Sequence, residues 1–484
     1  MPRTGQKYID AINDGRTIYL NGELIKNHIT HPAFAGAVKS IAQIYDFNST
    51  HNSMTFTTPT GRITSKAWEL PTSGEKLMER VTAALRTAQH SFGWLGRSPD
   101  HVAAALTGMV THPEIFEAHS LDSKQALLQY YEYARDNDLY IAYTIVSPQG
   151  NRSKSPGECQ DNLFHTLRVV SESGDGIIVR GAKMLGTAAV LADELLVGVQ
   201  NPMKDGVDDD YAISFATPLN AEGIKIMSRK SYAVETNAFD DPLTSRFDES
   251  DSIIYFDHVF VPWARIFVYR DVQMCRQQFH STAAEILMDL QSQARLTVKL
   301  NFLAGLAREV ALTNGVIDYP SVREMLAELA CQATLSDGLL KALYSAPVRH
   351  HEYYIPNQTL LYACQATNQT IYPKVLDIMR RLSGGGLIML PSHIKDFMHI
   401  EIGSIIEATQ YSSSKTPRER VKLMKLAWDA IGSEFGSRHL QYEMFYSGPH
   451  FAALARLYSQ YDWESGRSLV VEALSSEFDD LTTA

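Results

Sequence analysis

Three short segments of the sequence concentrate side chains that can bind ions or move protons. They are 94–101 (WLGRSPDH), 140–148 (YIAYTIVSP) and 429–439 (DAIGSEFGSRH). Arg97 stays charged at any working pH, whereas His101 and Tyr143 can each donate and accept hydrogen bonds. Of these three residues only His101 would titrate near pH 7. Side chains of these types are uncommon in an apolar core, so the three segments are candidates for a functional site.

The common motifs for nucleotide binding and nucleophilic catalysis are missing from the sequence. There is no GxGxxG after a predicted strand, no GxxxxGK[ST] and no GxSxG. The glycine run 384–386 lacks the lysine that would hold a phosphate, so we interpret it as a flexible helix break. From the residues alone the chain is therefore an enzyme-sized protein without a defined reaction.

The sequence gives no sign of a metal site. Its four cysteines (Cys159, Cys275, Cys331 and Cys364) are spread singly, without a CxxC pair. His350, His351 and Glu352 resemble a metal-binding group, but they lack the i, i+4 spacing that places two imidazoles on one helix face. We predict a solvated helix end at this position and no bound metal.

The texture of the sequence changes twice along the chain, which predicts three parts. Residues 1–139 carry helical patterns broken by turn signals. Residues 140–267 hold short runs rich in Val, Ile, Tyr and Phe, separated by Gly, Asp, Asn and Pro, which predict an antiparallel β domain of sandwich or barrel type. Residues 268–484 return to helices, now long ones. The expected fold class is α+β, with an α, β, α order.

The helices of the third part are marked by their apolar spacing and by their first residues. One apolar seam predicts a bundle helix that ends before Gly315; it is formed by Leu296, Leu300, Leu303, Ala307 and Val310. Two further helices are predicted to begin at capping boxes, namely Ser321-x-x-Glu324 after Pro320, and Thr416-Pro417-x-Glu419.

Composition and charge exclude several classes of protein. The chain has 484 residues, of which 45% are hydrophobic and 20% charged, and this is ordinary globular composition. With a net charge of −11 and with its Lys and Arg scattered, the chain has no basic region to neutralise phosphates, so we expect no nucleic acid as a partner. No apolar stretch approaches the roughly 18 residues of a membrane helix, and residues 1–14 hold no apolar stretch of signal-peptide type. We expect a cytoplasmic protein without a membrane segment.

Collinear motifs along nearly the whole chain resemble one known family. They include Thr4-Gly5-x-x-Tyr8, 30–34 (THPAF), 175–183 (DGIIVRGAK), 242–249 (PLTSRFDE), 261–263 (VPW), 266–271 (IFVYRD), Arg295-Leu296-x-Val298-Lys299-Leu300 and 428–436 (WDAIGSEFG). Together they make the chain similar to the oxygenase components of the 4-hydroxyphenylacetate 3-monooxygenase family. This family includes chlorophenol monooxygenases and tyrosine hydroxylases that act on carrier-bound substrates.

The resemblance implies a fold, a reaction and partners. The implied fold is that of the acyl-CoA dehydrogenases, with an N-terminal helical domain, a middle β domain and a C-terminal helix bundle. The implied cofactor is FAD, supplied as FADH₂ by a separate NAD(P)H:flavin reductase, and O₂ is the second co-substrate. In such enzymes a flavin C4a-hydroperoxide hydroxylates a phenol ortho to its oxygen. The substrate would be a free or carrier-tethered phenol, and the assembly a homotetramer built through the bundle seam.

The resemblance also assigns roles to the polar segments. Arg97 matches the arginine that binds the phenol oxygen in the family. Where the hydroxyphenylacetate enzymes have a Tyr four residues later and a His on the first β strand, this chain has His101 and Tyr143. We expect both to line the substrate pocket, although the exchange puts hydroxyphenylacetate itself in doubt.

For the flavin, the resemblance implies contacts from two domains. Residues 144–148, including Thr144, Ile145 and Ser147, match the segment that runs along the flavin ring, and Thr187 matches a hydroxyl donor near flavin N5. Arg295 and Arg438 would bind the pyrophosphate from the bundle side. Lys299 is expected to be an external charge.

Three other functions compete with this hypothesis. An acyl-CoA dehydrogenase needs a carboxylate base, for which the sequence offers no candidate, and the related radical dehydratase needs closely spaced cysteines for an iron–sulfur cluster. A catalytically silent partner protein with a flavin-enzyme fold is the third possibility. Retention of Arg97, Thr187 and Arg295 counts against it.

Overall fold

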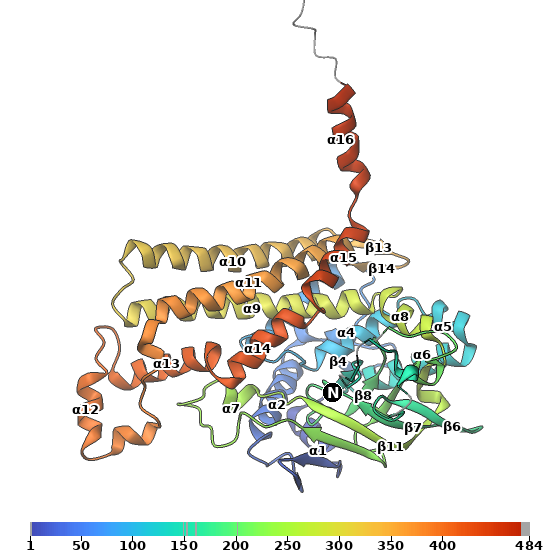
Figure 1. The fold of residues 1–484 in the computed structure, drawn as a ribbon, viewed down its shortest axis with the longest axis horizontal. Helices are drawn as coiled ribbons and strands as arrows, with labels where there is room; N and C mark the ends of the chain where they lie inside the picture. The colour runs from blue at the N-terminus through green and yellow to red at the C-terminus, as the bar shows by residue number, and fades with distance from the viewer. Residues whose placement is uncertain (1, 149, 152, 160–161, 201, 476–484) are drawn as a thin grey trace, which may run out of the picture.

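The computed structural model describes residues 2–475 except 149, 152, 160, 161 and 201. Figure 1 shows long helices lying side by side along one edge of the molecule, with the β sheets and the N-terminal helices below them. The predicted order of helical, β and helical parts is confirmed, and with it the α+β fold class.

The N-terminal helices are fixed by caps and buried faces. The side chains of Thr4 and Ser73 accept hydrogen bonds from the first turns of α1 and α3. Every residue of α4 is buried, because this helix packs directly on the long bundle helix α9. The helices of this part are α1 (Gly5–Ile12), α2 (Ala35–Thr50), α3 (Gly74–His90), α4 (Asp100–Met109), α5 (Glu114–His119) and α6 (Leu121–Asp136), with the hairpin β3 (Thr55–Thr57) and β4 (Ile63–Ser65) between α2 and α3.

Two sheets form the β layer of the described chain. The larger has the order β2-β1-β10-β11-β7-β6 and the smaller β12-β9-β8-β5. Their strands are β1 (Ile18–Leu20), β2 (Glu23–Leu24), β5 (Ile141–Thr144), β6 (Arg168–Glu172), β7 (Gly176–Lys183), β8 (Glu194–Val197), β9 (Ile213–Pro218), β10 (Ile224–Ser228), β11 (Ser252–Pro262) and β12 (Ile266–Tyr269).

Most strand pairs of the β layer are antiparallel, as predicted, but two pairs are parallel. β5 pairs with β8 in parallel, and β1, from the start of the chain, pairs with β10 in parallel. Parallel pairs need long connections, and here the chain between each pair supplies them. The first residues of the protein thus contribute to the larger sheet.

The C-terminal bundle is organised around α9 (Ala284–Thr313), and the predicted seam from Leu296 to Val310 is buried along it. The seam packs against helices of the same chain, so it does not require another subunit. The other long helices are α10 (Pro320–Ser345), α11 (Gln358–Ser383), α13 (Pro417–Ile431) and α14 (Glu434–Phe445).

Of the two predicted capping boxes, the one at α13 is confirmed and the one at α10 is wrong. Thr416 and Glu419 form the reciprocal box at the start of α13. At α10, Pro320 is already in the first turn and Tyr319 is the N-cap without a side-chain bond, so Ser321 caps nothing. Proline at the first helical position supplies the start signal instead.

Shorter elements connect and extend the bundle. α16 projects away from the body of the molecule (Figure 1). Among the described residues no helix is long and apolar enough to cross a membrane. The shorter elements that connect and extend the bundle are α7 (Thr244–Phe247), α8 (Val272–His280), the hairpin β13 (Val348–His350) and β14 (Tyr353–Ile355), α12 (Ile402–Thr409), α15 (His450–Gln460) and α16 (Trp463–Ser475).

Candidate active site

A cavity of about 440 Å³ lies where the β layer meets α14. Its walls come from the turn before α4, from β5 and the residues after it, from the loops flanking β7 and β11, and from the end of α14. The lining residues are Arg97, Tyr143, Ile145, Val146, Leu185, Thr187, Gln200, Asp251, Arg438, Gln441, Tyr442, Phe445, Tyr446 and Gly448. A larger groove of about 800 Å³ adjoins it and shares Val146, Gln200 and Gly448.

Arg97 presents its guanidinium to this cavity between aromatic rings. The guanidinium carbon lies 4.6, 5.4 and 4.9 Å from the ring centroids of Tyr143, Tyr442 and Tyr446. Burial acts to lower the pKa of Arg97, but the three tyrosines and Glu249 outweigh it and raise the pKa above its ordinary value. Among the described residues no carboxylate forms an ion pair with this guanidinium, so the cation is available to an anionic ligand.

The backbone around Arg97 is held by two hydrogen bonds. Its N–H donates to Glu249 Oε1 at 2.5 Å, and its carbonyl accepts from the Tyr140 hydroxyl at 2.5 Å. Both partners are distant in the chain, and both are buried. The position of Arg97 is therefore set by the β layer as well as by α4.

His101 lies behind Arg97 and does not line the cavity, which corrects our expectation. It is fully buried, and its Nε2 lies 2.6 Å from Arg97 Nη1 and 3.0 Å from the Tyr446 hydroxyl. Arginine can only donate, so Nε2 is the acceptor and a neutral ring carries its proton on Nδ1. Burial, and then the charges of Arg97 and Arg295, hold the pKa of His101 well below its usual range. His101 is thus a neutral residue that positions Arg97, and it does not titrate near pH 7.

Tyr143 does line the cavity, and its ring stacks on His101 with the centroids 5.5 Å apart. His101 and Tyr143, the two positions at which this chain exchanges the Tyr and His of the hydroxyphenylacetate enzymes, are therefore in contact. Sequence analysis missed two further aromatic walls, Tyr442 and Tyr446. Together with Arg438 they are spaced four residues apart, which places them on one face of α14 and its end. That spacing was the signal that could have found them.

Thr187 and Arg438 meet at Asp251 on the cavity wall. The Thr187 hydroxyl donates to Asp251 Oδ1 at 2.7 Å, and Arg438 binds both oxygens of Asp251 at 2.7 and 3.0 Å. Burial opposes the charged carboxylate, yet Arg438 and Arg229 lower its pKa well below the usual range. Because the Thr187 proton is engaged, this hydroxyl faces the cavity as an acceptor, not as the donor that we expected.

At the end of β5 and just after it, successive side chains point to different places. Thr144 points away from both, since its hydroxyl donates to the Met184 carbonyl at 2.9 Å. Ile145 lines the cavity and Ser147 lines the groove. The Ser147 Oγ is buried and has no hydrogen-bond partner among the described residues. A buried hydroxyl without a partner beside an open groove fits a polar ligand there.

Arg295 does not reach the cavity, and its assignment to the pyrophosphate is corrected. Its guanidinium binds both oxygens of Glu443 at 2.8 and 2.7 Å and is almost fully buried. Lys299 is also buried, so our expectation of an external charge was wrong; its Nζ lies 2.8 Å from Glu443 Oε1 and 3.1 Å from His439 Nδ1. These groups attach α14 to α9 and so hold the face that carries Tyr442 and Arg438.

The fold and the cavity define a class of protein, one with a helical–β–helical architecture and a cationic pocket lined by aromatic rings. Models of the N-terminal and C-terminal parts of 4-hydroxyphenylacetate 3-hydroxylase match residues 4–268 and 275–475. The chain belongs to the 4-hydroxyphenylacetate 3-hydroxylase family, as the sequence motifs indicated.

Curated relatives and solved structures agree over almost the whole chain. The oxygenase component of 4-hydroxyphenylacetate 3-monooxygenase from Geobacillus sp. (strain PA-9) is 32% identical over 98% of this chain and 96% of its own. The oxygenase component of 4-nitrophenol 2-monooxygenase from Rhodococcus sp. is 30% identical over 98% and 92%. The crystal structure of the HpaB oxygenase component with FAD and 4-hydroxyphenylacetate has a TM-score of 0.92 at 29% identity, covering 98% of both chains.

The radical dehydratase alternative shares the fold only. A 4-hydroxybutyryl-CoA dehydratase from N. maritimus has a TM-score of 0.88 at 20% identity. Among the described residues of this chain, the single cluster able to hold a metal ion contains no cysteine. The cavity offers Asp251 as its only described carboxylate, and with a lowered pKa it is a weak base for dehydrogenase chemistry.

Proposed function

We propose that this chain is the oxygenase component of a two-component flavin-dependent monooxygenase that hydroxylates a phenol ortho to its oxygen. The observation that supports it most is Arg97, a cation without a paired carboxylate among the described residues, enclosed by three tyrosine rings. Family membership supplies the reaction class.

Arg97 would bind the phenolic oxygen and stabilise its anion. A free phenol ionises near pH 10, and an adjacent cation lowers this pKa because it favours the charged form. Ionisation makes the ortho carbon more electron-rich and so more reactive toward an electrophilic oxygen. Neutral His101 contributes by holding Arg97 without adding a second charge.

The remaining cavity residues fit a reduced FAD, which supplies activated oxygen from O₂ when bound. Ile145 and Thr187 would contact the ring system, and Ser147 would offer a hydroxyl to polar parts of the cofactor. Arg438, which is paired with Asp251 and Glu249 on the cavity wall, would contact the cofactor without giving up these ion pairs. The apolar walls contributed by Leu185 and Phe445 would limit access of water. A separate NAD(P)H:flavin reductase would supply the reduced cofactor, and this requirement for NAD(P)H fits a cytoplasmic enzyme.

A substrate panel tests this function. The purified chain is mixed with FAD, NADH, a flavin reductase and one phenol at a time, including 4-hydroxyphenylacetate, 4-nitrophenol, a chlorophenol, tyrosine and a carrier-tethered tyrosine. We expect at least one of them to gain a single oxygen atom ortho to the hydroxyl, taken from labelled O₂ and detected by mass spectrometry. Omission of the chain or of the reductase is the control. Incorporation from water, or flavin reduction by acyl-CoA substrates, would contradict the proposal.

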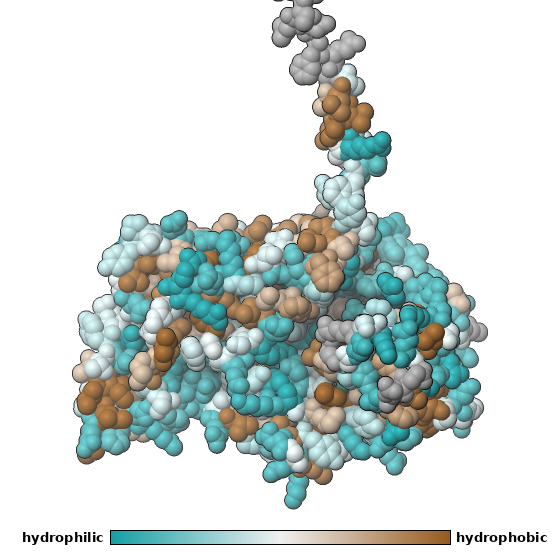
Figure 2. All heavy atoms as spheres, viewed as in Figure 1, coloured by the Kyte–Doolittle hydropathy of each residue, from teal (hydrophilic) through white to brown (hydrophobic). Residues whose placement is uncertain are grey.

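We further propose that the chain forms a homotetramer, and the reason lies on its surface. Exposed apolar side chains gather around α12 and along α16, where Figure 2 shows hydrophobic surface. They include Ile400 at 93% exposed and Leu474 at 82%. Surfaces of this kind are typical of contacts between subunits. Light scattering at micromolar concentration should give four times the chain mass, and a monomer would refute the assembly.

A further inference from the structure

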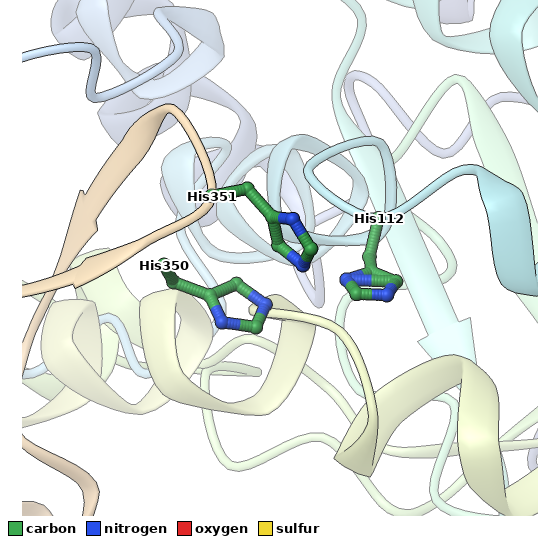
Figure 3. A group of neighbouring side chains, drawn as sticks. All are labelled: His112, His350 and His351. Carbon is green, nitrogen blue, oxygen red and sulfur yellow. The ribbon is translucent and has the colours of Figure 1, made fainter.

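Three histidines from two distant parts of the chain meet at the surface between α4 and the β13–β14 hairpin. They are His112, His350 and His351, and Figure 3 shows their rings facing one another. One ring nitrogen from each lies within 4.8 Å of those of the other two. The ring centroids of His112 lie 5.3 Å from His350 and 4.4 Å from His351.

The backbone of the hairpin explains how adjacent histidines reach the same side. His350 pairs with Tyr353 at the end of β13, so His351 and Glu352 form the turn and not the helix end that we predicted. His351 has a φ of 55°, in the left-handed region of backbone conformation that residues other than glycine rarely adopt. This conformation breaks the alternation of a strand and turns the His351 ring toward His112.

His112 has a ring nitrogen, Nδ1, that is free to bind a metal ion. It follows α4, and its Nε2 lies 3.5 Å from Glu114 Oε1. Its Nδ1 is buried and has no hydrogen-bond partner among the described residues. A buried ring nitrogen without a partner is unfavourable unless something binds to it.

We propose that His112, His350 and His351 form a zinc site at the end of α4. Three imidazoles and one water molecule are ligands that Zn²⁺ accepts in tetrahedral geometry. Zinc–nitrogen bonds of about 2.0–2.1 Å require ligand atoms closer together than those here, so binding would need small rotations of all three side chains, none of which is fully buried. The ion would join the hairpin between α10 and α11 to the end of α4, the helix that begins beside Arg97.

Zinc binding by untagged protein tests the site without any flavin. After treatment with EDTA and removal of the chelator, zinc chloride is titrated in competition with a chromophoric chelator. We expect one tightly bound Zn²⁺ per chain and a melting temperature that rises with zinc concentration by mass action. His351→Asn and His112→Gln should each weaken binding at least tenfold and remove the zinc-dependent rise.

His258→Asn is the matched control. His258 is exposed and also has a left-handed φ, 59°, and Asn tolerates this region in both variants. We expect it to bind zinc like the parent protein. His351→Asn changes only an exposed turn, so circular dichroism should stay native and a loss of binding then reports on the site. Absence of a stoichiometric zinc, or equal binding by His351→Asn and the parent, would overturn the proposal while leaving the monooxygenase function untouched.

Discussion

Arg97→Ala is expected to uncouple the enzyme, so that it consumes reduced FAD with little hydroxylated product. The substitution removes a charge-assisted hydrogen bond to the phenol oxygen worth about 1.5–3 kcal/mol, or roughly ten- to a hundred-fold in the rate of hydroxylation. Use of reduced flavin should continue, because the residues proposed to contact its ring system, Ile145 and Thr187, are unchanged. The measurements are product formed and H₂O₂ released per reduced FAD, together with the melting temperature.

Two further variants make this result specific. Arg97→Lys should recover only part of the loss, since an ammonium group does not reproduce the planar fork of a guanidinium. Arg323→Ala removes a surface arginine whose side chain is 65% exposed, and it should leave coupling unchanged. If Arg97→Ala instead keeps normal coupling and only lowers the melting temperature, Arg97 has a structural role and does not bind the substrate.

Glu443→Gln is expected to lower the free energy of unfolding by about 3–5 kcal/mol, because it leaves buried cations without their counter-charge. Glu443 binds both Arg295 and Lys299, and all three side chains are almost fully buried. Lys299, whose burial lowers its pKa to about 7, can lose its proton, but Arg295 cannot. Equilibrium unfolding in urea measures the loss.

The pH dependence of stability gives a second test of the same carboxylate. Despite burial, Arg295 and Lys299 lower the pKa of Glu443 from 4.5 to about 2. A carboxylate whose pKa is lower in the folded state stabilises the fold above its unfolded pKa, and this contribution disappears as the pH falls. The parent should therefore lose this stabilisation between pH 4.5 and about 2, and Glu443→Gln should lack that part of the acid dependence.

The control for this substitution lies on the same helix. Glu434 pairs with Lys230, and both side chains are more than 60% exposed, at 62% and 68%. Exposed ion pairs contribute about 0–1 kcal/mol, so Glu434→Gln should have little effect. Equal stability of the two variants would show that the buried ion pairs do not hold α14 on α9.

The sequence by itself determined the features that depend on local spacing. The seam of α9 and the capping box at Thr416 follow from residues three or four apart, which a helix places on one face or at one end. The order of helical and β parts follows from the same periodicities. Arg97 was found as a candidate through its motif, and the cavity includes it.

Only the tertiary structure decided which polar side chains face the cavity. His101 is turned away because Arg97 and Tyr446 bind its ring, and Tyr446 is 345 residues distant. Arg295 is withdrawn from the cavity by Glu443, 148 residues away, and the hairpin histidines gain a third ring from His112. The spacing of residues along the sequence predicts which side chains share a face of one helix or strand. The partner that satisfies a buried charge comes from another element, and only packing brings the two together.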